Sequence, residues 1–134
     1  MTVPVVLDLF RQARRADFIE AQRFAREDLA QAHPVEAGIS GLPESLRQEL
    51  FLVTWFYDDL GKLVAHGVVS EDLVLGAFGD GVTRTWKALM PYVEAERGLR
   101  SSTFQAYFED LAVRAESNPP RSVHARLGLR QWVD

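Results

Sequence analysis

The sequence predicts an all-α fold, a single-domain bundle of about five helices with one long central helix. Apolar residues recur at helical spacing through most of the chain, and no run alternates apolar and polar residues for long enough to form a strand. With 134 residues, of which 47% are hydrophobic, the chain has enough apolar side chains for one sizeable core. We therefore expect a helical bundle domain over residues 1–117, followed over 118–134 by a C-terminal tail or a short docking helix.

The N-terminal region carries two amphipathic stretches. The first is centred on Leu9, and Asp17 is placed to cap a second one. The pattern leaves open whether residues 3–32 form one helix or two. Because the residue before a proline is pushed out of the helical region, Pro34 is expected to end this segment and to open a glycine-containing loop that lasts to Pro43.

The central helix is expected to run from about Glu44 to His66, with Gly67 as a left-handed cap. Apolar residues spaced by four and three form a seam along it that packs against a neighbouring helix. Other apolar residues lie off this seam, so the helix is expected to be covered on more than one side, within the bundle or by a dimer interface. The seam consists of Leu46, Leu50, Val53, Tyr57, Leu60 and Val64, and the off-seam residues are Phe51, Leu52, Trp55 and Phe56.

The second half of the chain is expected to contain three further helices. Ser70 is a natural N-cap for a short helix that ends at Phe78, where Gly79-Asp80-Gly81 is expected to break it. A helix over residues 82–97 follows, and Pro91 predicts either a kink or a break inside it.

The last predicted helix begins after Thr103, which is placed to cap it. Asn118-Pro119-Pro120 is expected to stop this helix. The remaining residues are expected to form a short amphipathic or extended piece, with Trp132 near its end.

Composition narrows the classes of function. A formal net charge of -4 gives no overall basic field, so nucleic-acid binding is not expected. The chain has no cysteine, which excludes disulfides, thiolate nucleophiles and cysteine zinc sites. The apolar N-terminal stretch is interrupted by Asp8 and Arg11 and has no basic region before it, so we expect neither a signal peptide nor a membrane span. A cytoplasmic location follows by elimination.

No group of residues matches a known catalytic or metal-binding pattern. A Glu-x-x-His motif on two helices is missing, so we expect no metal and no cofactor. Asp58 and Asp59 point about 100° apart on a helix and cannot share a proton as a catalytic pair would. Asp58 is placed for an ion pair with Lys62, and a sharper hypothesis pairs Asp58 or Asp59 with Arg84 on the next long helix. His66 is expected to cap the end of its helix.

Short motifs through the middle of the chain resemble those of a known family. They are Tyr57-Asp58-x-Leu60-Gly61, Glu71-Asp72-Leu73-Val74, Phe78-Gly79, Arg84-x-Trp86, Pro91, Arg97 and Phe108-Glu109-x-Leu111. Over about Leu50 to Ala115 the chain is similar to small helical bacterial proteins, common in actinobacteria, that are classed as a domain of unknown function. The resemblance implies an all-helical fold. It implies no activity, substrate or cofactor, and some members carry an N-terminal membrane helix that we do not expect here.

Two functions are compatible with these patterns. We favour a non-catalytic protein-interaction or regulatory accessory module that recognises a protein partner or self-associates, because tryptophan and arginine are enriched at binding hot spots. The alternative is a small-molecule-binding protein or enzyme with a pocket between the central helices. The sequence leaves enzymatic activity open and favours its absence. The partner-binding candidates are Trp55, Arg126, Arg130 and Trp132, and the ligand-binding candidates are Tyr57, Asp58, His66, Arg84 and Trp86.

Overall fold

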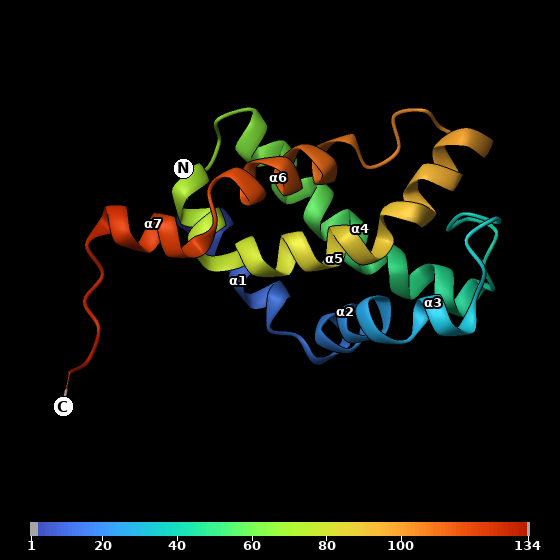
Figure 1. Ribbon diagram of the computed structural model, residues 1–134, viewed down its shortest axis with the longest axis horizontal. Helices are drawn as coiled ribbons and strands as arrows, with labels where there is room; N and C mark the ends of the chain where they lie inside the picture. Colours follow the sequence, from blue (N-terminus) through green and yellow to red (C-terminus); the bar gives the residue numbers. More distant parts are fainter. Residues whose placement is uncertain (1–2, 134) are drawn as a thin grey trace.

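The computed structural model describes residues 3–133, and the chain in that range is helical with no strand (Figure 1). The predicted all-α class is confirmed, whereas the number of helices exceeds the expected five. The described range contains seven: α1 (Val3–Ala13), α2 (Ala16–Glu27), α3 (Leu29–Ala32), α4 (Glu44–Ala65), α5 (Glu71–Leu99), α6 (Ala106–Ser117) and α7 (Pro120–Leu127).

The centre of the fold is formed by the two longest helices, α4 and α5. Figure 1 shows α6 above this pair and α2 below it, and both α2 and α6 pack against both central helices. The predicted seam of α4 is confirmed, since Leu50, Val53 and Leu60 are fully buried. The expected cover on more than one side is provided by α2 and α6. At Gly61 the backbone of α4 meets the backbone of Tyr107, where a Cβ atom would collide, so the glycine permits close packing of α6.

The N-terminal region contains two helices and a single further turn, which settles the question left open over residues 3–32. The chain leaves α1 after Ala13 and re-enters a helix at Ala16. The predicted cap was wrong by two residues: Arg15 occupies the N-cap position, and Asp17 lies in the first turn of α2. The carboxylate of Asp17 accepts a hydrogen bond from the backbone N–H of Phe18 at 2.8 Å.

Helix α5 is one continuous helix of 29 residues, so the predicted break at Gly79-Asp80-Gly81 was wrong. A Cβ atom at Gly79 would lie 2.9 Å from the ring of Pro120, which shows that this glycine makes room for α7. Each glycine inside a helix costs about 1 kcal/mol relative to alanine. The packing of α5 against α2, α6 and α7 outweighs this cost. Pro91 does not break the helix either, and Figure 1 shows α5 changing direction in its C-terminal part.

The start of α6 also differs from the prediction. The helix begins at Ala106 after Gln105, which has a left-handed backbone with φ of 58°, and Thr103 lies in the turn before it. The cap of α6 comes from another helix: the carboxylate of Asp58 accepts a hydrogen bond from the N–H of Phe108 at 3.0 Å. This contact satisfies a donor that would otherwise have no partner inside the helix.

Several other predicted helix ends are confirmed, although α5 runs to Leu99, two residues beyond the predicted end at Arg97. The hydroxyl of Ser70 accepts a hydrogen bond from the N–H of Leu73 and caps α5, and Gly67 has a left-handed φ of 73° after α4. The chain leaves the helical region at His33, and α6 ends at Ser117 before the two prolines.

Candidate functional site

Tyr57 and Trp86, the two aromatic ligand candidates, belong to the core. Each packs against the ring of Phe108, with a centroid distance of 5.1 Å in both pairs. Burial raises the pKa of the Tyr57 hydroxyl to about 12, so it stays protonated and acts as a hydrogen-bond donor near neutral pH. Phe108 therefore fills the space between Tyr57 and Trp86 where the sequence suggested a pocket.

The carboxylate of Asp58 has a structural role. Besides capping α6, it forms the predicted ion pair with Lys62 at 3.3 Å, and its side chain is only 13% exposed. The hypothesis that Asp58 or Asp59 pairs with Arg84 was wrong, because within residues 3–133 neither carboxylate contacts that guanidinium. Arg84 is exposed on α5 and faces a different hollow, which Asp80 also lines.

His66 is the C-cap residue of α4, as predicted. Its ring is exposed, and Nε2 lies 3.1 Å from the hydroxyl of Tyr107. The five predicted ligand residues therefore lie in separate places: Tyr57 and Trp86 in the core, Asp58 under the start of α6, His66 at the end of α4, and Arg84 on the outer side of α5.

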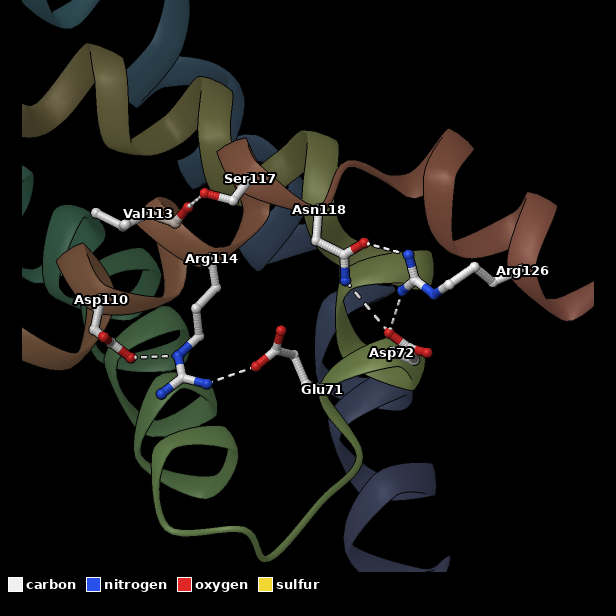
Figure 2. Close-up of polar contacts among 8 residues, drawn as sticks. All are labelled: Glu71, Asp72, Asp110, Val113, Arg114, Ser117, Asn118 and Arg126. Carbon is white, nitrogen blue, oxygen red and sulfur yellow. Dashed lines mark hydrogen bonds and ion pairs between the residues drawn. The ribbon is translucent and has the colours of Figure 1, made fainter.

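The start of α5 is held by a polar network that ties it to α6 and α7 (Figure 2). Arg114 on α6 forms an ion pair with Glu71 at 2.5 Å, and Arg126 on α7 forms one with Asp72 at 2.6 Å. Asn118 bridges Asp72 and Arg126 through its side-chain amide. Arg126, a predicted partner-binding residue, is thus occupied within the chain and fixes α7.

A cavity of about 480 Å³ lies between α1, α2, α4 and α5. Phe10, Phe18 and Phe78 give it aromatic walls, and Arg14 lies at its edge. Tyr57 alone among the five ligand candidates lines it. This volume falls within the range of typical small-molecule pockets, about 300–1,000 Å³.

Polar side chains from α2 and α5 meet at one end of this cavity. The hydroxyl of Tyr57 donates to Oε1 of Gln22, and that of Thr85 donates to the same oxygen at 3.4 Å. Arg26 donates from Nε to the hydroxyl of Thr85 at 3.0 Å and from Nη2 to the carbonyl oxygen of Gly81 at 3.3 Å. The network fixes the orientation of Gln22 and of the Arg26 guanidinium.

The chain after α7 presents apolar side chains to solvent. Figure 1 shows this segment leaving the body of the protein. Trp132 is 91% exposed and Val133 84% exposed, and Arg130 is exposed as well. Trp55, the remaining partner-binding candidate, lies on α4, is 58% exposed and stacks on Phe51 with centroids 5.0 Å apart. The four predicted partner-binding residues therefore lie on two surfaces, α4 and the C-terminal region.

Glu96 is a buried acid that the sequence analysis missed. Its carboxylate accepts hydrogen bonds from the N–H groups of Ile39 and Ser40 and from the Ser40 hydroxyl, and it pairs with Arg100 at 3.1 Å. Burial alone would raise the pKa of Glu96, but these hydrogen bonds and the arginine outweigh burial and hold the pKa below its ordinary value. The spacing from Glu96 to Arg100 is visible in the sequence, whereas the loop donors are more than fifty residues away.

Across residues 3–133, no three histidine, aspartate or glutamate side chains come together as metal ligands. In the same range, no helix combines the length and the apolar character that crossing a membrane requires.

Comparison with protein families gives one match. A family model described as "Domain of unknown function (DUF4760)" matches residues 5–115. This span contains most of α1, all of α2 to α5 and most of α6, and α7 and the segment after it lie outside. No curated protein and no solved structure matches the chain.

Proposed function

We propose that this chain, which belongs to the DUF4760 family, is a non-catalytic helical interaction module that self-associates through its C-terminal segment. We define residues 128–133 as the docking segment. The proposal also places the protein in the cytoplasm of an actinobacterium. The sequence resemblance supports the actinobacterial source, and the lack of cysteine supports the cytoplasmic location.

The observation that carries the proposal is the exposure of the docking segment. Leu129 is 59% exposed, and Trp132 and Val133 are more exposed still. Such side chains gain about 25 cal/mol per Å² of apolar surface when a partner covers them. The segment is presented at a defined place because Val123 of α7 is fully buried against the body and Arg126 is paired with Asp72.

Charge favours a second copy of the chain as the partner. Residues 118–134 carry three arginines and one aspartate, whereas residues 1–117 carry 12 basic and 18 acidic side chains. A basic, apolar segment on one copy thus complements an acidic body on another. Complementary charge increases the rate of association and selects the partner.

We place the receiving surface on the exposed side of α4. Leu52 and Trp55 are exposed apolar residues there, and Asp59 follows Trp55 by one helical turn. Trp132 would pack against Trp55, and Arg130 would lie near Asp59. An aromatic pair of this kind contributes about 0.5–1.5 kcal/mol beyond the area that it buries.

Sedimentation velocity of the full chain over a series of concentrations tests this function. We expect a reversible dimer that weakens as salt rises from about 50 to about 500 mM, because exposed charges are screened. Trp132→Ala and Trp55→Ala should each weaken the dimer by about tenfold, since buried tryptophans are typical hot spots.

Val113→Ala is the matched control, because Val113 is an exposed apolar residue on α6 outside both surfaces. It should leave the dimer unchanged. A chain that stays monomeric at every concentration, or a dimer that Trp132→Ala does not weaken, would contradict the proposal.

The cavity between α1, α2, α4 and α5 favours a second function, binding of a small molecule. Its supporting observation is that aromatic walls and polar side chains meet around one space of about 480 Å³. This site differs from the pocket that the sequence suggested, of which it contains only Tyr57.

A further inference from the structure

We infer that the cavity between α1, α2, α4 and α5 binds an aromatic carboxylate. This inference goes beyond the interaction function and does not depend on it. The ligand class follows from two features of the cavity, its aromatic walls and the positive charge at one end.

The walls suit a flat aromatic body. Phe10 and Phe78 stack with centroids 5.4 Å apart, and Phe18 meets Tyr57 edge-on with centroids 6.0 Å apart. These side chains come from four different helices, so the shape of the cavity is fixed by the fold. Aromatic rings prefer offset-stacked and edge-to-face neighbours, and both arrangements are available to a ring placed among these four.

The polar end offers hydrogen-bond donors and no acid. No aspartate or glutamate of residues 3–133 lines the cavity. The guanidinium of Arg14 has no partner in residues 3–133, and no carboxylate there pairs with Arg26. With Oε1 of Gln22 held by Tyr57 and Thr85, its amide nitrogen makes no hydrogen bond within the described chain.

The charge of Arg26 is uncompensated because the nearby acids pair with a different arginine. Arg23, on the same helix as Arg26, forms ion pairs with Glu20, Glu27 and Asp28. These three acids therefore compensate the charge of Arg23 and not that of Arg26. Arg26 is half-buried and directs its hydrogen bonds to a hydroxyl and a carbonyl oxygen. An anion in the cavity would meet the guanidinium of Arg14, which lines it, and would lie near Gly81, to which Arg26 donates.

A carboxylate suits a guanidinium at this end of the cavity. A planar carboxylate accepts two parallel hydrogen bonds from a guanidinium, the arrangement in which arginine binds anions most specifically. Tyr57 contributes no negative charge that would repel it, since its hydroxyl stays protonated near neutral pH. The aromatic body of the ligand would lie against Phe10 and Phe78, and its carboxylate would face Arg14 and Gln22.

The test uses 2-naphthoate as the probe and its neutral amide, 2-naphthamide, as the matched comparison. Binding to the full-length chain is followed by ¹H–¹⁵N correlation spectra. We expect naphthoate to bind with saturable chemical-shift changes confined to residues 10–22, 77–81 and the neighbourhood of Tyr57. The amide should bind about tenfold more weakly, because a hydrogen bond to a charged group contributes more than one between neutral groups.

Two variants place the probe in the cavity. Arg14→Gln should weaken naphthoate by about tenfold and leave the amide unchanged, whereas Arg11→Gln, an exposed arginine on α1 that does not line the cavity, should change neither. Ala77→Phe fills the cavity from an exposed position on α5 and should abolish binding of both probes.

Three results would overturn the inference. They are no saturable binding of naphthoate, equal affinity for naphthoate and its amide, and binding that survives Ala77→Phe. The spectrum of each free variant shows whether it is folded, so loss of binding is not confused with loss of structure. None of these results bears on the dimer, which is measured without a ligand.

Discussion

The helical body and the docking segment use the same kinds of side chain in opposite ways. In the body, large apolar residues such as Phe108 and Tyr92 are buried, whereas in residues 128–133 Leu129 and Trp132 face solvent. The matched family region ends at Ala115, inside α6, so the segment lies outside it. The proposed association would therefore depend on residues other than those that stabilise the body, and mutation should separate the two.

Helix α7 joins these two regions. Its Val123 is fully buried. Nε2 of its His124 lies 2.9 Å from the carbonyl oxygen of Gly76 on α5. Pro120 packs against Gly79, and Arg126 adds an exposed ion pair with Asp72. The helix therefore belongs to the body on one side and carries the docking segment on the other.

The largest effect on stability is expected from Phe108→Ala. Phe108 is fully buried and packs against both Tyr57 and Trp86, so its removal leaves a cavity between α4, α5 and α6. We expect a loss of about 3–5 kcal/mol in the free energy of unfolding, measured by urea denaturation. Val113→Ala, an exposed position on the same helix, should change it by less than about 0.5 kcal/mol. Similar losses for both variants would remove the distinction between buried and exposed positions of α6.

A comparison of two glycines tests the loop that covers the end of α5. Gly38 and Gly67 both have a left-handed backbone, but a Cβ at Gly38 would lie 2.5 Å from Oε1 of Glu96, whereas a Cβ at Gly67 would meet nothing within 4 Å. Gly67→Ala should cost about 1–2 kcal/mol for its conformation alone. Gly38→Ala should cost about 1–3 kcal/mol more, because the new methyl group crowds a buried carboxylate. Equal melting temperatures for the two variants would argue against this close contact.

Glu96→Gln is expected to have an intermediate and pH-dependent effect. The variant loses the charge that Ser40, Ile39 and Arg100 bind, at a cost of about 1–3 kcal/mol near pH 7. The folded-state pKa of Glu96 lies below the unfolded value, so its contribution is present above about pH 4.3 and is lost as pH falls through the folded-state pKa.

Denaturation curves of the two proteins should therefore converge on acidification. Glu94→Gln, an exposed acid on the same helix, serves as the control and should follow the unmodified protein at every pH. A constant difference between Glu96→Gln and the unmodified protein from pH 7 to pH 3 would show that the charge of Glu96 contributes nothing.

The smallest effect is expected from Asp72→Asn, which removes the charge that pairs with Arg126. Both side chains are about half exposed, and such pairs contribute about 0–1 kcal/mol, so global stability should barely change. Hydrogen exchange of the amides of residues 123–127 should nevertheless accelerate, because α7 loses one of its attachments. Unchanged exchange in α7 would show that the ion pair does not hold this helix and that its other contacts with α5 suffice.

Much of the fold could be predicted because many of its determinants are local. The seam of α4 follows from apolar spacing, and the cap of α5 follows from Ser70 standing before two acids. The continuity of α5 could not be predicted, because Gly79 and its partner Pro120 are 41 residues apart in the sequence. The cap that Asp58 provides for Phe108 spans fifty residues and was missed for the same reason.

The candidate cavity was predicted less well than the fold. Tyr57 was singled out, but Arg14 lies in the turn after α1 and Gln22 lies on α2, and nothing in the sequence brings them together. Arg26 resembles its neighbour Arg23 in the sequence. Only their partners in space, acids for Arg23 and a hydroxyl for Arg26, distinguish an arginine in a surface ion-pair cluster from one that joins α2 to α5.

The most direct test of the central claim is an isotope-filtered NOE spectrum of a one-to-one mixture of labelled and unlabelled chains. The proposed self-association predicts contacts between the indole of Trp132 in one chain and Leu52 or Trp55 in the other. Such contacts would show that the docking segment is covered by a second copy. Contacts of Trp132 within its own chain alone, at concentrations where the protein is dimeric, would contradict the account.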